Sequence, residues 1–397
     1  MTNTSLNRLV SIDIMRGITL FLMLFVNDLY TPGVPKWMVH TEASYDGMGL
    51  ADWVFPGFLF MVGLSVPFAM AARRKVNSSS GSLLLHILVR SVSLIIIGVV
   101  ILNGDRINPQ LTGISGLWWK ALVYVCIFLI WNFYPQKSKY KALFNALQMI
   151  GAAGLICLVA VFKAGTPENT QWLEIGWWGI LGLIGWGYLV AALAYLVTSD
   201  NFKLSLLFFL SFLLLNILTQ AGLVHFSGWA GKIFGVVLSG NVPSVTLAGL
   251  TAGILIKTGK QNRSKLLKQL LVMGVVCVAA GFILRHWFII SKIYGTPSWA
   301  MICNGISILL FVGVYYLTDI KKVVSWSGLF EIAGKNSLTT YLAPDMVYFM
   351  CWGFSIPLFF YKQEHNMLLA VGGSVVWSVL MILFAYVLSK LYIKLKL

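Results

Sequence analysis

Long apolar runs recur along the whole chain, and they limit most strongly what the chain can fold into. A helix needs about 20 mostly apolar residues to cross a bilayer, and a hydrocarbon interior admits only helices and closed barrels. The sequence therefore predicts an all-α polytopic membrane protein, a bundle of 10–12 transmembrane helices that forms one domain over residues 1–397. The expected spans are residues 12–30, 51–72, 82–103, 116–134, 141–162, 175–197, 204–224, 233–256, 265–290, 298–318, 327–353 and 367–390.

The composition agrees with a membrane protein and excludes a soluble one. Hydrophobic residues make up 58% of the chain and charged residues only 11%, whereas soluble domains carry about 25% charged residues. The net charge of +16 does not indicate nucleic-acid binding, because most lysines and arginines lie in alternate loops between the expected spans. By the positive-inside rule, this asymmetry predicts that both termini are cytoplasmic and that His40 lies on the outer side.

The five cysteines are scattered through apolar segments, and none forms a CxxC pair. We therefore expect neither a disulfide framework nor a bound metal. The first residues hold no apolar run followed by a small-residue cleavage site, so we expect no cleaved signal peptide.

Polar residues gather at the ends of the first two expected spans. Asn27 and Asp28 end the first span, Asp52 begins the second, and His40 lies in the loop between them. Taken singly, they are typical of a polar helix end, a helix N-cap with Pro56 in the first turn, and a solvated loop histidine. Consecutive spans are neighbours, however, so we expect Asn27, His40 and Asp52 to meet at one depth. A carboxylate that orients an imidazole, beside an amide that stabilises an oxyanion, suits acyl transfer.

Other charges inside the expected spans need a reason, since a charge at membrane depth is costly. Arg90 lies well inside its span, and the stretch GKNSLTTY places Lys335 and Asn336 inside another. Polar groups at this density indicate a cavity rather than lipid contact. Three further basic residues near span ends are interpreted as side chains that snorkel to the interface: Arg16, Lys120 and Arg285.

Three stretches carry a resemblance to a known family: RLVSIDIMRGITLFLMLFVND, ASYDGMGLADWVFPGFLFMVG and GKNSLTTY. They resemble the transmembrane acetyltransferase family of the heparan-α-glucosaminide N-acetyltransferase and its bacterial homologues. In the family pattern a histidine stands immediately before the second stretch, whereas here Thr41 and Glu42 separate it from His40. The arginines of the family's R-I-P-G-V-L-Q-R segment are absent, so their cofactor contacts do not transfer.

This resemblance implies transfer of the acetyl group of cytoplasmic acetyl-CoA to the amine of an extracytoplasmic amino sugar. His40 would handle the acetyl group, while Asp52 orients its imidazole and Asn27 stabilises the oxyanion. The acidic groups expected to attract a cationic acceptor are Asp28, Glu42 and Asp46. The expected acetyl-CoA contacts, in a cavity between the first, second and GKNSLTTY spans, are Arg90, Lys335 and Asn336. The resemblance also implies a multi-pass protein of the bacterial inner membrane with His40 facing the periplasm, and it is compatible with a homodimer.

Several alternatives stay open at the level of the sequence. A transporter of a small sugar or peptide also fits twelve spans with cytoplasmic termini, although the polar cluster lies at one end of the spans and no internal repeat is visible. An O-acetyltransferase acting on a glycan hydroxyl would keep the architecture and change the acceptor. The sequence also leaves open the identity of the acceptor, and whether the acetyl group passes through an acetyl-histidine or is transferred directly.

Overall fold

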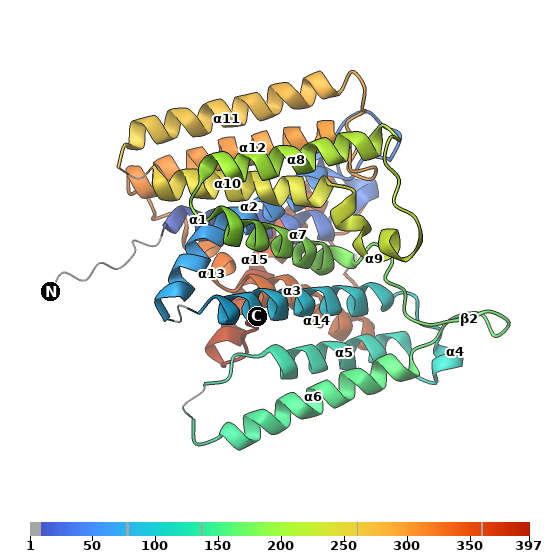
Figure 1. Cartoon of the computed structure of the whole chain (residues 1–397). Coiled ribbons are helices and arrows are strands. Elements are labelled where there is room, and N and C mark those ends of the chain that lie inside the picture. The colour runs from blue at the N-terminus through green and yellow to red at the C-terminus, as the bar shows by residue number, and fades with distance from the viewer. Residues whose placement is uncertain (1–8, 77–78, 136–137, 260, 359) are drawn as a thin grey trace.

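The computed structural model describes residues 9–76, 79–135, 138–259, 261–358 and 360–397. These residues form a helical bundle with one small β-hairpin, β1 (Ala164–Gly165) and β2 (Thr170–Gln171) (Figure 1). Within these residues, ten spans are long and apolar enough to cross a membrane, in agreement with the all-α polytopic class. They are α1 (Val10–Asp28), α2 (Leu50–Val76), α3 (Ser80–Asn103), α6 (Lys141–Val161), α7 (Gly179–Thr198), α8 (Phe202–Gln220), α9 with α10 (Gly228–Leu238 and Asn241–Thr258), α11 (Arg263–Leu284), α12 (Pro297–Tyr315) with the π-helical turn Tyr316–Ile320, and α15 (Met367–Lys390).

Two expected spans are interrupted where hydropathy predicts continuous helices. The span expected at 327–353 divides at Asn336, and the span expected at 233–256 contains a break at Gly240, whose φ is 73°. Hydropathy averages apolar character over a window of residues, so it does not detect a turn at a single residue. The remaining elements are α5 (Gly116–Trp131), α13 (Gly328–Lys335), α14 (Ser337–Gly353), α4 (Pro109–Thr112) and the 3₁₀ turns Thr31–Gly33 and Lys36–Met38.

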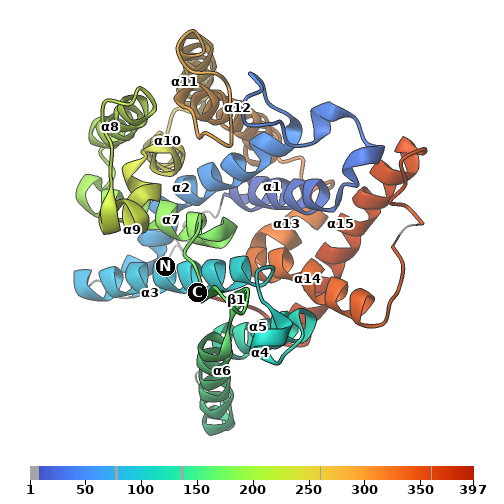
Figure 2. The ribbon, with the colours of Figure 1, turned by 90° about the vertical axis from the view of Figure 1, so that its right-hand side faces the viewer.

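The helix α2 lies inside the bundle and packs against α10 and α1 (Figure 2). Glycines let the backbones of α2 and α10 touch. A Cβ added to Gly63 would lie 1.8 Å from the Thr246 carbonyl oxygen, and one added to Gly249 would lie 2.0 Å from that of Phe60. Helices in lipid associate through small residues in this way, because burial against lipid tails gives no hydrophobic gain. This packing fixes the helix that carries Asp52 at one end.

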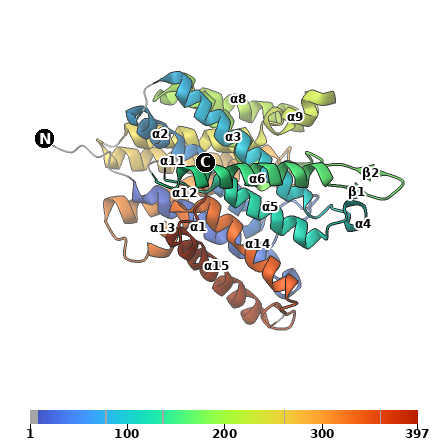
Figure 3. The same cartoon turned by 90° about the horizontal axis from the view of Figure 1, so that it is seen from below.

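The helices α5 and α6, over the two spans expected at residues 116–134 and 141–162, form a hairpin at the edge of the bundle (Figure 1, Figure 3). The helix α5 packs against α14 as well as α6. Large apolar side chains of α6 remain exposed, among them Met149, Ile150 and Ile156. An exposed apolar surface of this kind suits contact with lipid.

The helix ends gather at two polar faces of the bundle. On one of them, the backbone N–H of Ser11 donates to the Asp319 carboxylate at 2.9 Å, which joins the start of α1 to the end of α12. Because successive helices alternate in direction, the basic end of α2 at Arg73 lies on this face, which we call the Arg73 face. The opposite face holds the β-hairpin and the loop with His40, and we call it the His40 face. Their orientation in a membrane stays a prediction.

Candidate active site

His40 and Asp52 form a hydrogen-bonded pair on the His40 face. The imidazole Nδ1 lies 2.7 Å from Asp52 Oδ1. The Asp52 side chain is fully buried, whereas 49% of the His40 side chain is exposed. A buried carboxylate on Nδ1 orients the ring and leaves Nε2 to face a molecule that approaches from outside the bundle.

Three further hydrogen bonds hold the Asp52 carboxylate. Its Oδ2 accepts the backbone N–H groups of Thr41 at 3.1 Å and Gly49 at 3.0 Å, and the Thr41 hydroxyl at 3.0 Å. Asp52 is the third residue of α2, so it reaches back to the helix start as in a capping box. Asp52 is therefore not the N-cap that the sequence predicts, because it lies three residues after the N-cap position, which Gly49 occupies. Thr41, one of the two residues inserted relative to the family pattern, takes part in holding the pair.

Pro56 lies inside α2 and not in its first turn as expected. Proline has no N–H, so the carbonyl of Asp52, four residues earlier, lacks its helical donor. The indole N–H of Trp299, on α12, donates to this carbonyl at 3.2 Å. The bond satisfies a buried backbone oxygen next to the pair and ties α12 to α2.

The loop between α11 and α12 brings Lys292 to the same pair. Its Nζ lies 3.1 Å from Nδ1 and 3.3 Å from Nε2 of His40. Burial lowers the pKa of Lys292 from its ordinary value, and the charge of Asp52 opposes this effect. Lys292 is therefore placed to exchange a hydrogen bond or a proton with the ring. No local pattern around Lys292 indicates this role, because Lys292 resembles any other loop lysine.

Polar contacts join this loop to the loop that carries His40. The Asp46 carboxylate accepts the backbone N–H of Ile290 at 2.8 Å and the Nε–H of Arg285 at 2.9 Å. The Ser291 hydroxyl donates to the Ala43 carbonyl at 2.8 Å. The bond from Ile290 lowers the pKa of Asp46, desolvation opposes it, and Arg285 adds to it. Arg285 is thus a loop-joining residue, which corrects its interpretation as a snorkelling side chain.

Asn27 and Glu42, both predicted for this site, are exposed. Asn27 is the penultimate residue of α1. No hydrogen bond within the described residues involves the side chain of either one. The structure therefore brings His40 and Asp52 together, while the roles of Asn27 and Glu42 stay predictions.

Asp28, the last residue of α1, is buried among polar partners. Its Oδ1 accepts hydrogen bonds from the hydroxyls of Tyr348 and of Tyr361, the latter at 3.2 Å. Lys362 Nζ lies 3.1 Å from the same oxygen. The other oxygen, Oδ2, is buried and has no hydrogen-bond partner among the described residues. Asp28 therefore keeps one free acceptor atom, although its charge is shared with Lys362.

A cavity of about 390 Å³ lies between α1, α2, α3, α7 and the junction of α13 with α14. Lys335 and Arg90 line it, whereas Asn336, the next residue along, does not. The side chain Oδ1 of Asn336 is buried and has no partner among the described residues. Among the described residues that line it there is no aspartate or glutamate, and the basic side chains are those of Arg16, Arg73, Arg90, Lys335 and Lys396.

Two of these arginines show how the wall is built. The Arg16 guanidinium donates to the Ser65 hydroxyl at 2.6 Å and to the Gly334 carbonyl at 3.4 Å. Arg16 thus lines the cavity, which corrects its interpretation as a snorkelling residue. The Arg90 guanidinium lies 4.6 Å from the ring centroid of Tyr188, and its buried Nε has no hydrogen-bond partner among the described residues. A buried donor without a partner is costly, so the wall fits an anionic ligand.

The cavity follows α2 toward the His40–Asp52 pair. Its lining on α2 runs from Arg73 to Phe58, which is about 22 Å at the helical rise per residue. Phe58 is six residues from Asp52, or about 9 Å along the axis. The apolar inner end of the cavity is therefore directed at the pair, and its basic end opens on the Arg73 face.

Comparisons with known proteins bear on the identity of the chain. A family described as a domain of unknown function, DUF5009, matches residues 8–224. The heparan-alpha-glucosaminide N-acetyltransferase of Mus musculus is 41% identical over 100 residues, which are 25% of this chain and 15% of the mouse protein. The protein of that name from Homo sapiens is 43% identical over 96 residues, 24% of this chain and 14% of the human protein. The family match covers more than half of this chain, so the chain belongs to the DUF5009 family.

Proposed function

We propose that the protein is a membrane acetyltransferase. It takes the acetyl group of acetyl-CoA at the Arg73 face and delivers it to the amine of an amino sugar at the His40 face. In this proposal the Arg73 face is cytoplasmic and the His40 face periplasmic, in the inner membrane of a bacterium. The distribution of lysine and arginine supports this orientation. The similarity to two N-acetyltransferases over a quarter of the chain supports the reaction.

The observation that carries the proposal is the cationic cavity aimed at the His40–Asp52 pair. Coenzyme A carries several negative charges at one end, which the five basic side chains of the cavity would attract. Its pantetheine arm is long, thin and uncharged, and the half of the cavity that leads to Phe58 is likewise lined by uncharged side chains. A cofactor bound in this way would present its thioester toward the pair.

Transfer breaks the thioester C–S bond and forms an amide C–N bond, while a proton moves from the amine to the departing thiolate. Asp52 holds the hydrogen on Nδ1 of His40, so Nε2 carries the lone pair. His40 accepts a proton at Nε2 from the attacking amine, and Lys292, 3.3 Å from that atom, assists the exchange. We assign stabilisation of the oxyanion to Asn27. We assign the attraction of a cationic acceptor to Asp28, Glu42 and Asp46.

Two routes are compatible with this pair. In the direct route, His40 is only a base, and the amine attacks the thioester. In the covalent route, Nε2 attacks first, coenzyme A leaves, and the amine then takes the acetyl group from the ring. A single turnover with radiolabelled acetyl-CoA and no acceptor separates them. Label that stays on the wild-type protein but not on His40→Ala indicates the covalent route, and no retained label indicates the direct one.

The test of the function is an acceptor screen with the purified protein in detergent. We expect release of the coenzyme A thiol that depends on an added amino sugar and disappears in His40→Ala. The product distinguishes an amide from an ester, because hydroxylamine cleaves only an O-acetyl group rapidly. Uptake of a sugar into proteoliposomes without any acetyl-CoA consumption would contradict the proposal and favour a transporter.

Labelling of introduced cysteines tests the proposed orientation. Glu42→Cys and Arg74→Cys place a thiol at exposed positions on the His40 face and the Arg73 face, respectively. The exposed native Cys157 is first replaced by serine. In intact cells an impermeant thiol reagent should label position 42 and not position 74. The reverse pattern would overturn the direction of transfer.

A further inference from the structure

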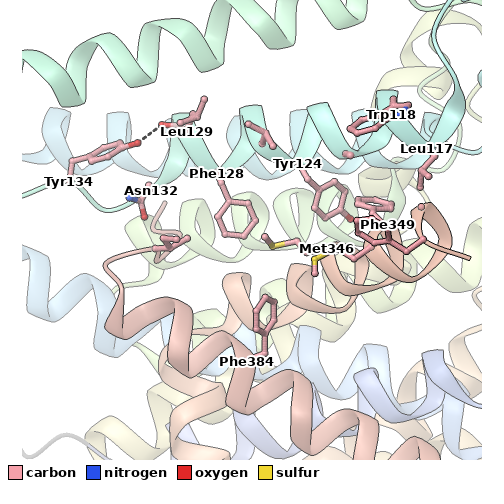
Figure 4. Close-up of a pocket in the computed structure, with 16 residues that line it drawn as sticks. Leu117, Trp118, Tyr124, Phe128, Leu129, Asn132, Tyr134, Met346, Phe349 and Phe384 are labelled. Atoms are coloured by element: carbon pink, nitrogen blue, oxygen red, sulfur yellow. Dashed lines mark hydrogen bonds between the residues drawn. The ribbon is translucent and has the colours of Figure 1, made fainter. Parts of the chain in front are cut away.

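A second cavity, of about 650 Å³, lies between α5 and the helices α14 and α15 (Figure 4). Its wall is almost entirely apolar. Phe128 and Trp118 of α5 line one side, and Met346 and Phe349 of α14 with Phe384 of α15 line the other. Figure 4 shows α5 and α14 facing each other across the gap, with Phe384 closing it from below. This cavity belongs to the peripheral part of the bundle and shares no lining helix with the cationic cavity except α14.

The apolar cavity is long and runs along α5. Its lining begins at Leu117, near the start of α5, and reaches Asn132, which follows its last residue. These residues are about 22 Å apart at the helical rise. The hydrocarbon core of a bilayer is about 30 Å thick, so one leaflet contributes about 15 Å. The cavity is therefore long enough to hold one acyl chain lying along the helix.

A polar pocket at the Arg73 face adjoins this cavity. This pocket has a volume of about 210 Å³ and shares Asn132 and Tyr134 with the apolar cavity. Lys141, the first residue of α6, and Lys396 also line it. Among the described residues, no aspartate or glutamate lines either cavity. An apolar cavity thus adjoins a small cationic pocket at the membrane face that is richer in lysine and arginine.

The shape and charge of this composite site decide between two occupants. A helix from a second copy of the chain would need a broad apolar face, and it would gain nothing from two lysines at one end. A molecule with an apolar tail and an anionic head matches both parts at once. Basic pockets between transmembrane helices on the cytoplasmic side suit anionic lipid head groups.

We propose that this site binds an anionic phospholipid. Its phosphate lies between Lys141 and Lys396, and one acyl chain lies in the apolar cavity between α5 and α14. The binding does not depend on the enzymatic activity proposed above, so either proposal can fail alone. Lys396 also lines the cationic cavity, which makes the lipid head a neighbour of that wall.

Native mass spectrometry of the purified full chain tests the proposal. The probes are dioleoyl phosphatidylglycerol, which is anionic, and dioleoyl phosphatidylcholine, which is zwitterionic with the same acyl chains. We expect the wild-type protein to retain phosphatidylglycerol preferentially when both are added in equal amounts. Equal retention of the two lipids would overturn the assignment, and this result needs no variant.

Matched variants test each half of the site. Lys141→Ala should weaken retention of phosphatidylglycerol about fivefold, the effect of one lysine near an anionic lipid surface. Lys139→Ala, whose side chain lies over the Tyr140 ring and not in the pocket, should not. Ala121→Trp fills the apolar cavity and should lower retention, whereas Leu122→Trp on the exposed side of α5 should not. Equal effects within either pair would contradict the proposed position of the lipid.

Discussion

Replacing Asp52 by asparagine tests the site most directly, because the structure predicts how the new amide is oriented. Oδ2 of Asp52 accepts three donors, two from Thr41 and one from Gly49, whereas Oδ1 has His40 as its one hydrogen-bond partner among the described residues. The amide oxygen should take the Oδ2 position. The opposite orientation would set an NH₂ group against three donors, and each buried donor left unpaired costs about 1–3 kcal/mol. The NH₂ group then points at Nδ1 of His40 and donates to it.

This orientation reverses the tautomer of the ring. Nδ1 becomes the acceptor, and the hydrogen moves to Nε2, the atom to which we assign the chemistry. In a serine-protease triad the same exchange lowers kcat about 10⁴-fold, which corresponds to about 5 kcal/mol. We expect a loss of this order in the initial rate of coenzyme A release with glucosamine as acceptor. The thermal midpoint in detergent should stay close to that of the wild type, because every hydrogen bond to the side chain is kept.

Glu168→Gln is the matched control, since it removes an exposed carboxylate from the β-hairpin on the same face. It should leave the rate unchanged. An Asp52→Asn protein that keeps its rate within tenfold of the wild type would refute the reasoning. So would a rate that falls only in step with the thermal midpoint, because Asp52 would then be a structural residue.

Three further predictions follow from the packing and the charges. Arg90→Ala should raise the KM for acetyl-CoA about tenfold or more and change kcat less, since a hydrogen bond to a charged group contributes about 1.5–3 kcal/mol; Arg74→Ala, exposed and outside the cavity, should leave this KM unchanged. Gly63→Val should lower the thermal midpoint by a few degrees, because its Cβ would lie too close to a backbone carbonyl of α10. Gly313→Val should leave the midpoint unchanged, because a Cβ there has no atom of the described residues within 4 Å. Lys292 has a folded-state pKa below its ordinary value of 10.5. At pH values between the folded-state pKa and 10.5, the unfolded chain binds more protons at Lys292 than the folded chain does. The free energy of unfolding of the wild type relative to that of Lys292→Met should therefore rise with pH in that window. A difference in thermal midpoint between the two proteins that is independent of pH would contradict the burial of this amine.

The sequence by itself determined the fold class and the position of most of the long helices. A run of about 20 apolar residues has one stable form in a bilayer, so the span expected at 51–72 appears as the helix Leu50–Val76. The sequence also predicted that His40 and Asp52 meet, because the loop between two consecutive spans keeps the end of the first span close to the start of the second. These are local consequences of chain connectivity, and they need no knowledge of how distant helices pack.

Only the tertiary structure decided what surrounds that pair and which basic residues line the cavity besides Arg90 and Lys335. Lys292 is 252 residues from His40 and reaches it through a loop held by Asp46. The local sequence around Arg16 or around Arg285 does not indicate whether the side chain snorkels to water, lines a cavity or joins two loops. Which role each takes depends on the faces that neighbouring helices present, and those faces are set by close contacts such as that of Gly63 with α10. Contacts of this kind join helices that are far apart in the sequence, so no short window of the sequence predicts them.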